Sequence, residues 1–238
     1  MKRAIVIPAY NEETTIGQVL DSLLDFKLYQ IIVIDDGSTD NTATIVQQYP
    51  HVVLLSLATN LGAWKAMQTG IRYCYVNDYD RVITFDADGQ HLPNSITQLV
   101  AAQSLSDDDV VIGSCIQRGS GARHVAWRLF RALSCIDVAD LTSGLRIYSR
   151  AAIAILSSRE ATLLEYQDVG VLLMLKTFGL SLSEVQVEML PREDGISRIF
   201  HSWGAVCYYM THTTLLCLSK VKLSNEFAYQ KALNNYND

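Results

Sequence analysis

The sequence predicts an α/β fold, in which a mostly parallel central sheet is flanked by helices. Residues 4–7 and 31–34 are uninterrupted runs of aliphatic, largely β-branched side chains, a pattern typical of parallel strands covered on both faces. Between these runs, apolar residues recur at helical spacing, at Ile16, Val19, Leu20, Leu23 and Leu24. This alternation favours right-handed crossovers and a doubly wound sheet, which binds ligands at the carboxyl ends of its strands.

The same alternation continues along the chain. In the first half we expect a helix near 42–48, a strand at 52–56, a helix at 62–76 and a strand that ends at Phe85. In the second half we expect helices at 95–103, 122–135, 150–156 and 169–178, and strands at 110–113 and 182–187. No linker interrupts the series, so we expect one catalytic domain over residues 1–200 and a helical segment over 201–238.

Composition and charge exclude several classes of protein. The 238 residues carry a formal net charge of -6, which argues against binding to bulk nucleic acid, since such binding needs a basic face. The 5 cysteines show no Cys-x-x-Cys spacing, which fits reduced thiols in the cytosol. The apolar run at 4–7 is too short for a signal peptide, and the segment 203–218 falls short of a membrane span. We therefore expect a cytoplasmic protein.

Two carboxylates, Asp86 and Asp88, come directly after the predicted strand that ends at Phe85. A hard divalent cation that holds a diphosphate prefers a few carboxylate oxygens at such a strand end. Polar clusters also follow the first and second strands, at residues 8–12 and 35–40. Each cluster alone could be a turn or a helix cap. Because all three follow parallel strands, we expect them to converge on one crevice.

Six motifs resemble, in this order, the landmarks of family 2 glycosyltransferases with the GT-A fold: IVIPAYNEE, VIDDGSTDNT, NLGAWKAMQTGI, FDADGQH, DLTSGLRIYSR and PREDGISR. Within that family the chain is similar to dolichol-phosphate mannose synthases, their bacterial polyprenyl-phosphate relatives and short polysaccharide transferases. The resemblance implies an inverting, metal-dependent transfer of sugar from a UDP- or GDP-linked donor. The acceptor would be polyprenyl phosphate or a lipid-linked glycan of the cell envelope.

The resemblance also implies which residues bind the nucleotide. Pro8, Tyr10 and Glu12 would line its pocket, while Ile34 and Asp36 would receive the base and ribose. A carboxylate such as Asp36 suits this role, because its charge-assisted hydrogen bonds are strong and directional.

Asp86, Ala87 and Asp88 match the family's Asp-x-Asp motif. The resemblance implies that Asp86 contacts the ribose or phosphate and that Asp88 binds the cation. Gln90 is a possible additional ligand, and the metal set would be Asp86, Asp88 and Gln90. The cation expected is Mg²⁺ or Mn²⁺.

Arg192 and Arg198 occupy the basic positions of the last motif. There the resemblance suggests a mobile loop that closes over the diphosphate. Two cations would stabilise the developing negative charge and exclude water from the donor. The alternative is a solvated charged turn.

Acidic residues are also expected near the acceptor. Related transferases carry one around residues 165–168, where the register admits Glu165 or Asp168, and Asp168 is preferred. A base is needed only for a hydroxyl acceptor, since an acceptor phosphate is already ionised. Asp140 either positions the acceptor or caps local backbone N–H groups. The synthases place an arginine where this chain has Cys115.

The carboxyl-terminal segment has one helical face of mostly apolar residues: Phe200, Trp203, Cys207, Met210, Thr214, Cys217 and Val221. An amphipathic helix of this kind could lie on the inner face of the cell membrane, or it could pack on the domain or on another subunit. A homo-oligomer is therefore possible. A different class of function is a non-catalytic nucleotide-binding subunit of a membrane-associated glycan assembly complex.

Overall fold

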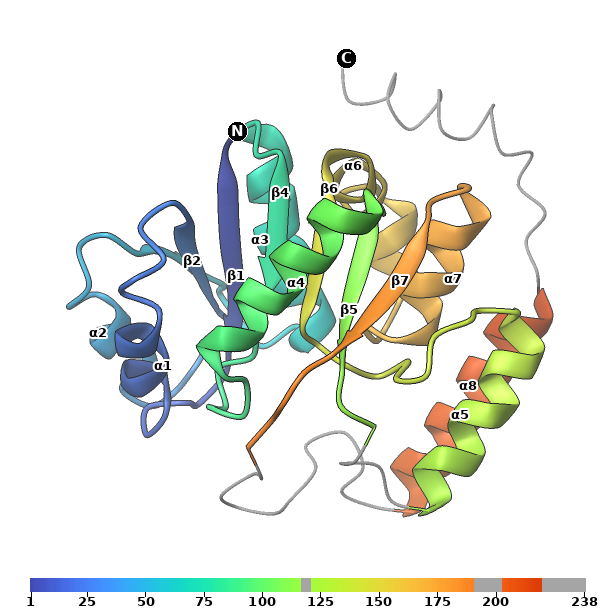
Figure 1. Cartoon of the computed structure of the whole chain (residues 1–238). Helices are drawn as coiled ribbons and strands as arrows, with labels where there is room; N and C mark the ends of the chain where they lie inside the picture. The colour runs from blue at the N-terminus through green and yellow to red at the C-terminus, as the bar shows by residue number, and fades with distance from the viewer. Residues whose placement is uncertain (117–120, 191–202, 220–238) are drawn as a thin grey trace.

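The computed structural model describes residues 1–116, 121–190 and 203–219 (Figure 1). Its centre is a seven-stranded sheet with the order β3-β2-β1-β4-β6-β5-β7. The strands are β1 (Arg3–Ala9), β2 (Gln30–Asp35), β3 (Val53–Ser56), β4 (Arg81–Thr84), β5 (Val110–Ser114), β6 (Arg146–Ser149) and β7 (Leu182–Gln186). β6 runs antiparallel to β4 and β5, and the other pairings are parallel. The expected mostly parallel sheet is confirmed.

Helices cover both faces of the sheet. One layer contains α1 (Ile16–Ser22), α2 (Thr42–Val46) and α4 (Pro93–Ser106), and the other contains α3 (Ala63–Val76), α6 (Arg150–Leu156) and α7 (Val169–Thr177). A short 3-10 helix, η2 (Glu160–Leu163), joins α6 to α7. The two remaining described helices, α5 (Gly121–Ser134) and α8 (Trp203–Ser219), lie side by side beyond the β7 side of the sheet (Figure 1).

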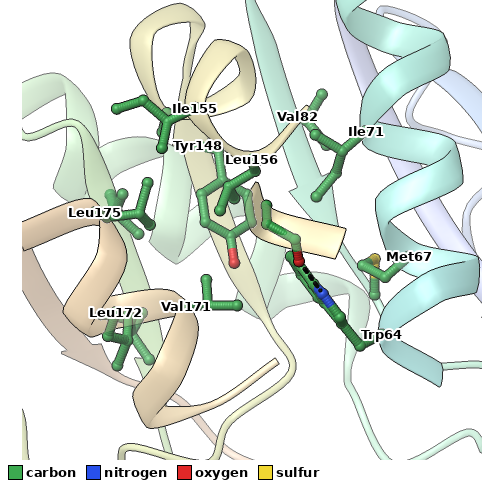
Figure 2. Packing of buried hydrophobic residues seen from close by; sticks show 14 of the residues in the cluster. Trp64, Met67, Ile71, Val82, Tyr148, Ile155, Leu156, Val171, Leu172 and Leu175 are labelled. Atoms are coloured by element: carbon green, nitrogen blue, oxygen red, sulfur yellow. Dashed lines mark hydrogen bonds between the residues drawn. The ribbon is translucent and has the colours of Figure 1, made fainter. Parts of the chain in front are cut away.

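The two-sided burial of the central strands explains their unbroken apolar sequence. In β1, Ile5 and Ile7 belong to one core and Ala4 and Val6 to the other, and all four are fully buried. On the α3 side, Trp64, Met67 and Ile71 of α3 line one side of the core in Figure 2, with Leu172 and Leu175 of α7 opposite. Burial of a side chain of this size stabilises the fold by about 1.5–3 kcal/mol.

Polar side chains of α3 hold the segment between α6 and α7. The Trp64 indole donates a hydrogen bond of 2.9 Å to the carbonyl of Ala161 (Figure 2), and Gln68 and Arg72 donate to carbonyls of residues 156–158. These three donors are spaced four residues apart, so they share one face of the helix. Gln68 and Arg72 satisfy carbonyls at and just after the end of α6, and Trp64 binds a carbonyl of η2, so α3 holds this segment in place.

β6 is the element that sequence analysis did not predict. Its first residue, Arg146, is charged yet fully buried, so the strand lacks the apolar run that marks β1 and β2. The guanidinium is accommodated because Nε donates to the carbonyl of Ser143 at 2.9 Å and one terminal nitrogen donates to that of Leu141 at 3.1 Å. These local acceptors reduce the cost of burying the charge.

The carboxyl-terminal helix α8 is present, with apolar residues on its exposed as well as its buried face. Tyr209 and Cys217 are buried against the core, whereas Tyr208, Leu215 and Leu218 are each more than half exposed. Among the helices of the described ranges, none is both long and apolar enough to cross a membrane.

Candidate functional site

The loops that leave β1, β2 and β4 meet at the carboxyl edge of the sheet. β1 pairs with β2 on one side and with β4 on the other, all three in parallel. The first two loops are joined directly, because Asn11 N–H donates to the Ser38 hydroxyl at 3.0 Å and Thr39 N–H donates to the Asn11 side chain at 2.9 Å. The three strand ends therefore lie next to one another at the same edge of the sheet, as the sequence predicts.

The first loop forms the side of the site nearest β1. Asn11 has a φ of 53°, a left-handed conformation that asparagine tolerates better than most residues. Glu12 is buried, and its N–H donates to the Thr42 hydroxyl at 2.8 Å. Pro8 is half-buried in β1, while Tyr10 is 39% exposed and can reach a ligand.

Asp36 organises the second loop. Its two carboxylate oxygens accept hydrogen bonds from the N–H groups of Leu61 and Gly62, at 2.8 and 2.9 Å, just before α3 begins. Each oxygen keeps a second lone pair, so these bonds are compatible with a ligand contact. Ile34 is fully buried, and it packs against Gly70 of α3, where an added Cβ would lie 2.6 Å from the Ile34 side chain. Ile34 therefore belongs to the core between β2 and α3.

The third loop presents its two carboxylates while it buries the residue between them. Ala87 is 3% exposed, whereas Asp86 and Asp88 are half-buried. Asp88 Oδ1 accepts a hydrogen bond of 3.1 Å from Gln90 N–H, and Gly89 between them has a φ of 74°. The Gln90 amide nitrogen donates to the Leu190 carbonyl at 3.2 Å, which leaves its amide oxygen as the atom for a cation.

These oxygen donors suit Mg²⁺ or Mn²⁺. Within the described ranges, no three carboxylate, imidazole or thiol groups gather closely enough to hold a metal by themselves. Mg²⁺ commonly binds through one or two carboxylates together with substrate phosphates. The chemistry of Asp86, Asp88 and Gln90 fits that mode, in which a diphosphate completes the coordination.

Arg192 and Arg198 lie outside the described residues. The last described residue before them, Leu190, donates its N–H to the Gln90 carbonyl at 2.9 Å. The chain therefore enters the segment 191–202 from a point next to the loop of Asp86 and Asp88.

Asp168 follows a residue that binds the end of β4, whereas Glu165 pairs with α8. Gln167 donates to the hydroxyls of Thr84, at the end of β4, and of Tyr148, at 3.1 and 3.2 Å. Asp168 is 9% exposed, while Glu165 is exposed and accepts a hydrogen bond of 2.9 Å from Tyr208 of α8. Of the two acidic residues, the geometry favours Asp168 for a role near the site.

Burial raises the pKa of Asp168 above its usual 3.8, and a hydrogen bond from Tyr209 and the charge of Arg146 only partly oppose this effect. A raised carboxyl pKa means that the folded state binds the proton more tightly than the unfolded state. Stability from this group is therefore greatest below pH 3.8 and falls as pH rises through the folded-state pKa.

We predict that Asp168→Asn removes this pH-dependent loss of stability. The difference in free energy of unfolding between variant and wild type should grow in favour of the variant as pH rises from about 4 to 7. Urea unfolding at several pH values measures this difference. A difference that stays constant over the range would contradict the assigned protonation behaviour.

Asp140 is fully buried and binds local backbone. Its Oδ1 accepts from Thr142 N–H at 3.0 Å, and its Oδ2 accepts from Cys115 N–H at 3.3 Å. Of the two roles considered for Asp140, the geometry favours the structural one. It shapes the loop at residues 140–144, which lies beside the third strand-end loop.

Two residues at the site were not identified from sequence. A Cβ added to Gly144 would lie 2.7 Å from Asp86 Oδ2, so the Asp86 carboxylate occupies the space that a side chain would need. His91 is buried, and its Nε2 lies 2.9 Å from the same oxygen. The motifs FDADGQH and DLTSGLRIYSR contain these residues, but the contact of Gly144 with Asp86 appears only once β4 and β6 are paired.

Comparisons with known proteins agree with this arrangement. The sequence model of glycosyl transferase family 2 matches residues 4–156. The UDP-N-acetylglucosamine--dolichyl-phosphate N-acetylglucosaminyltransferase of Methanococcus voltae is 27% identical over 220 residues, covering 82% of this chain and 88% of that protein. The undecaprenyl-phosphate 4-deoxy-4-formamido-L-arabinose transferase of Proteus mirabilis is 30% identical over 212 residues, 83% of this chain and 62% of that protein.

Solved structures share the fold. Glucosyl-3-phosphoglycerate synthase from Mycobacterium tuberculosis, crystallised with Mn²⁺, UDP and phosphoglyceric acid, superposes with a TM-score of 0.66 at 24% identity. The match covers 91% of this chain and 78% of that one. Staphylococcus aureus TarS matches with a TM-score of 0.56 at 20% identity, covering 78% and 58% of the two chains. The likeness confirms the expected GT-A fold.

Proposed function

Because this chain belongs to glycosyl transferase family 2, we propose that it moves a sugar from a UDP- or GDP-linked donor to polyprenyl phosphate, with metal dependence and inversion. A lipid-linked glycan is the second acceptor class within this proposal. The observation that carries it is the meeting of the three strand-end loops, with Asp36, Asp86 and Asp88 at one edge of the sheet.

The donor side follows from the charges of the site. Asp88, with Asp86 and Gln90 beside it, would hold Mg²⁺ or Mn²⁺, which supplies positive charge to the departing diphosphate. Arg192 and Arg198 would add to that charge, as the family resemblance implies. Tyr10 and Asp36 would contact the nucleoside. The solved relative that was crystallised with Mn²⁺ and UDP supports this part of the proposal.

The acceptor assignment rests on chemistry and on the relatives' names. Relatives from Methanococcus voltae and Proteus mirabilis are named for dolichyl phosphate and undecaprenyl phosphate. A phosphate acceptor is already ionised at neutral pH, so it attacks the anomeric carbon without a general base. Asp168 would be needed as a base only if the acceptor were a sugar hydroxyl.

A lipid-linked acceptor would require contact with a membrane, and we propose that α5 and α8 provide it at the cytoplasmic face. Tyr208, Leu215 and Leu218 are exposed on α8, and Leu129 is 43% exposed on the neighbouring α5. Arg128 is exposed beside Leu129, where it could contact anionic headgroups. Association with a second copy through this surface is the alternative.

The proposed function predicts a new glycolipid. Purified protein, Mn²⁺ and a panel of nucleotide sugars are incubated with short polyprenyl phosphate or with sugar acceptors, and the products are identified by mass spectrometry. We expect one donor to give glycosyl polyprenyl phosphate, and we expect EDTA to abolish its formation. No glycosylated product with any donor would contradict the proposal.

A further inference from the structure

We propose that His91 is a positioning residue for the donor site, because it fixes the carboxylate of Asp86 from within the protein. This inference rests on the proposed function, in which Asp86 contacts the donor or its cation. His91 Nε2 lies 2.9 Å from Asp86 Oδ2. The His91 side chain has no exposed surface, whereas that of Asp86 is 36% exposed. The imidazole therefore holds Asp86 on its buried side and leaves the rest of the carboxylate accessible.

The backbone and ring of His91 are themselves fixed. His91 forms a β-bridge with Met189, and next to it Leu190 N–H donates to the Gln90 carbonyl at 2.9 Å. The imidazole packs on the Phe85 ring with 5.3 Å between centroids. Because its backbone and its ring are both fixed, His91 can orient a carboxylate at little further entropic cost.

The hydrogen-bond pattern assigns the imidazole proton to Nε2. His91 Nδ1 is buried and has no hydrogen-bond partner among the residues that the structure describes. A carboxylate accepts hydrogen bonds, so the N–H of the His91 to Asp86 bond belongs to Nε2. An imidazole in this tautomer orients Asp86 and leaves its negative charge available to a cation.

Gly144 confines the Asp86 carboxylate from another direction. A Cβ at position 144 would lie 2.7 and 2.8 Å from the two carboxylate oxygens, so the glycine Cα is packed directly against them. Between His91 and Gly144, Asp86 is held in one orientation. Loss of such an outer hydrogen-bond partner typically lowers metal affinity or activity by about 10–100-fold.

The test uses four variants of the full chain, one of which, Asp86→Asn, removes the charge of the carboxylate itself. His91→Leu removes the hydrogen bond to Asp86, and His91→Gln keeps an N–H donor at a similar reach. Ser95→Ala is the matched control, because the buried Ser95 hydroxyl donates to the Glu188 carbonyl, at 3.3 Å, in the segment that pairs with His91. Calorimetry gives the Kd of UDP and GDP with Mn²⁺, and kinetics give kcat and the KM values of donor and acceptor.

We expect His91→Leu to weaken Mn²⁺-dependent nucleotide binding by about 10–100-fold and to raise the donor KM similarly, with the acceptor KM unchanged. His91→Gln should restore binding to within about threefold of wild type, and Ser95→Ala should leave it unchanged. If His91→Leu bound nucleotide as wild type does while Asp86→Asn bound it weakly, the proposed role of His91 would be overturned and the donor-site proposal would not. Wild-type binding by Asp86→Asn would overturn the donor-site proposal as well.

A measurement on the wild-type protein keeps the inference testable if His91→Leu does not fold. Nitrogen NMR of ¹⁵N-histidine-labelled protein distinguishes the two imidazole tautomers. We expect the His91 signal to show the proton on Nε2. A proton on Nδ1 alone would overturn the proposal, because Nε2 could not then donate to Asp86.

Discussion

Asp88→Asn should abolish metal-dependent binding of the donor nucleotide. The substitution removes the charge that would hold the cation but keeps an oxygen that can accept the 3.1 Å hydrogen bond from Gln90 N–H. We expect kcat/KM to fall by about 100-fold or more, which corresponds to about 2.7 kcal/mol of transition-state stabilisation. Kinetics with the cognate donor, and calorimetry with UDP or GDP and Mn²⁺, measure the effect.

The same variant should fold normally. Asp88 is half-buried beside Asp86, so removing its charge should change the free energy of unfolding by no more than about 0.5 kcal/mol. Asp25→Asn is the matched control, because Asp25 is exposed between α1 and β2, at the opposite edge of the sheet. If Asp88→Asn and Asp25→Asn bound nucleotide equally well in Mn²⁺, the metal role of Asp88 would be wrong.

Gly144→Ala should impair the enzyme by displacing Asp86. The new methyl group would lie 2.7 Å from Asp86 Oδ2, a distance that real Cβ atoms do not tolerate, so the carboxylate must move. Its partly exposed side chain can move toward solvent, which would break the hydrogen bond to His91. We expect kcat/KM for the donor to fall by about 10–100-fold.

The stability cost of Gly144→Ala should be modest, about 1–3 kcal/mol, because one methyl group is inserted beside a movable side chain. Gly17→Ala is the control, since a Cβ at that helical position meets nothing nearer than 3.7 Å. Kinetics and urea unfolding of both variants separate function from stability. Wild-type donor kinetics for Gly144→Ala would show that the position of Asp86 does not matter.

The sequence was sufficient to predict the elements in which the pattern of apolar residues matches the pattern of burial. β1 and β2 are covered on both faces, so unbroken runs such as residues 4–7 identify them. β6 was not predicted because it begins with Arg146, a charged residue that is buried and donates from two of its guanidinium nitrogens to carbonyls of the preceding loop. That pairing depends on the folded loop and leaves no periodic signal in the sequence.

Part of the candidate site was also predictable from the sequence. The strand-end carboxylates Asp36, Asp86 and Asp88 follow from local pattern and family motifs, and the parallel sheet brings their loops together. The contributions of His91 and Gly144 depend on contacts between β4, β6 and the segment after β7. The family resemblance implies that Ile34 contacts the base, and this stays a prediction, since its buried side chain packs against α3.

The central claim is that Asp88 anchors a divalent cation beneath the diphosphate of the donor. A crystal structure of the protein with Mn²⁺ and UDP or GDP, with data collected for Mn anomalous scattering, tests it most directly. We predict one strong anomalous peak within coordination distance of an Asp88 carboxylate oxygen and of the diphosphate, next to Gln90. A nucleotide bound away from the β1, β2 and β4 loops, or a Mn²⁺ peak remote from Asp88, would contradict the claim.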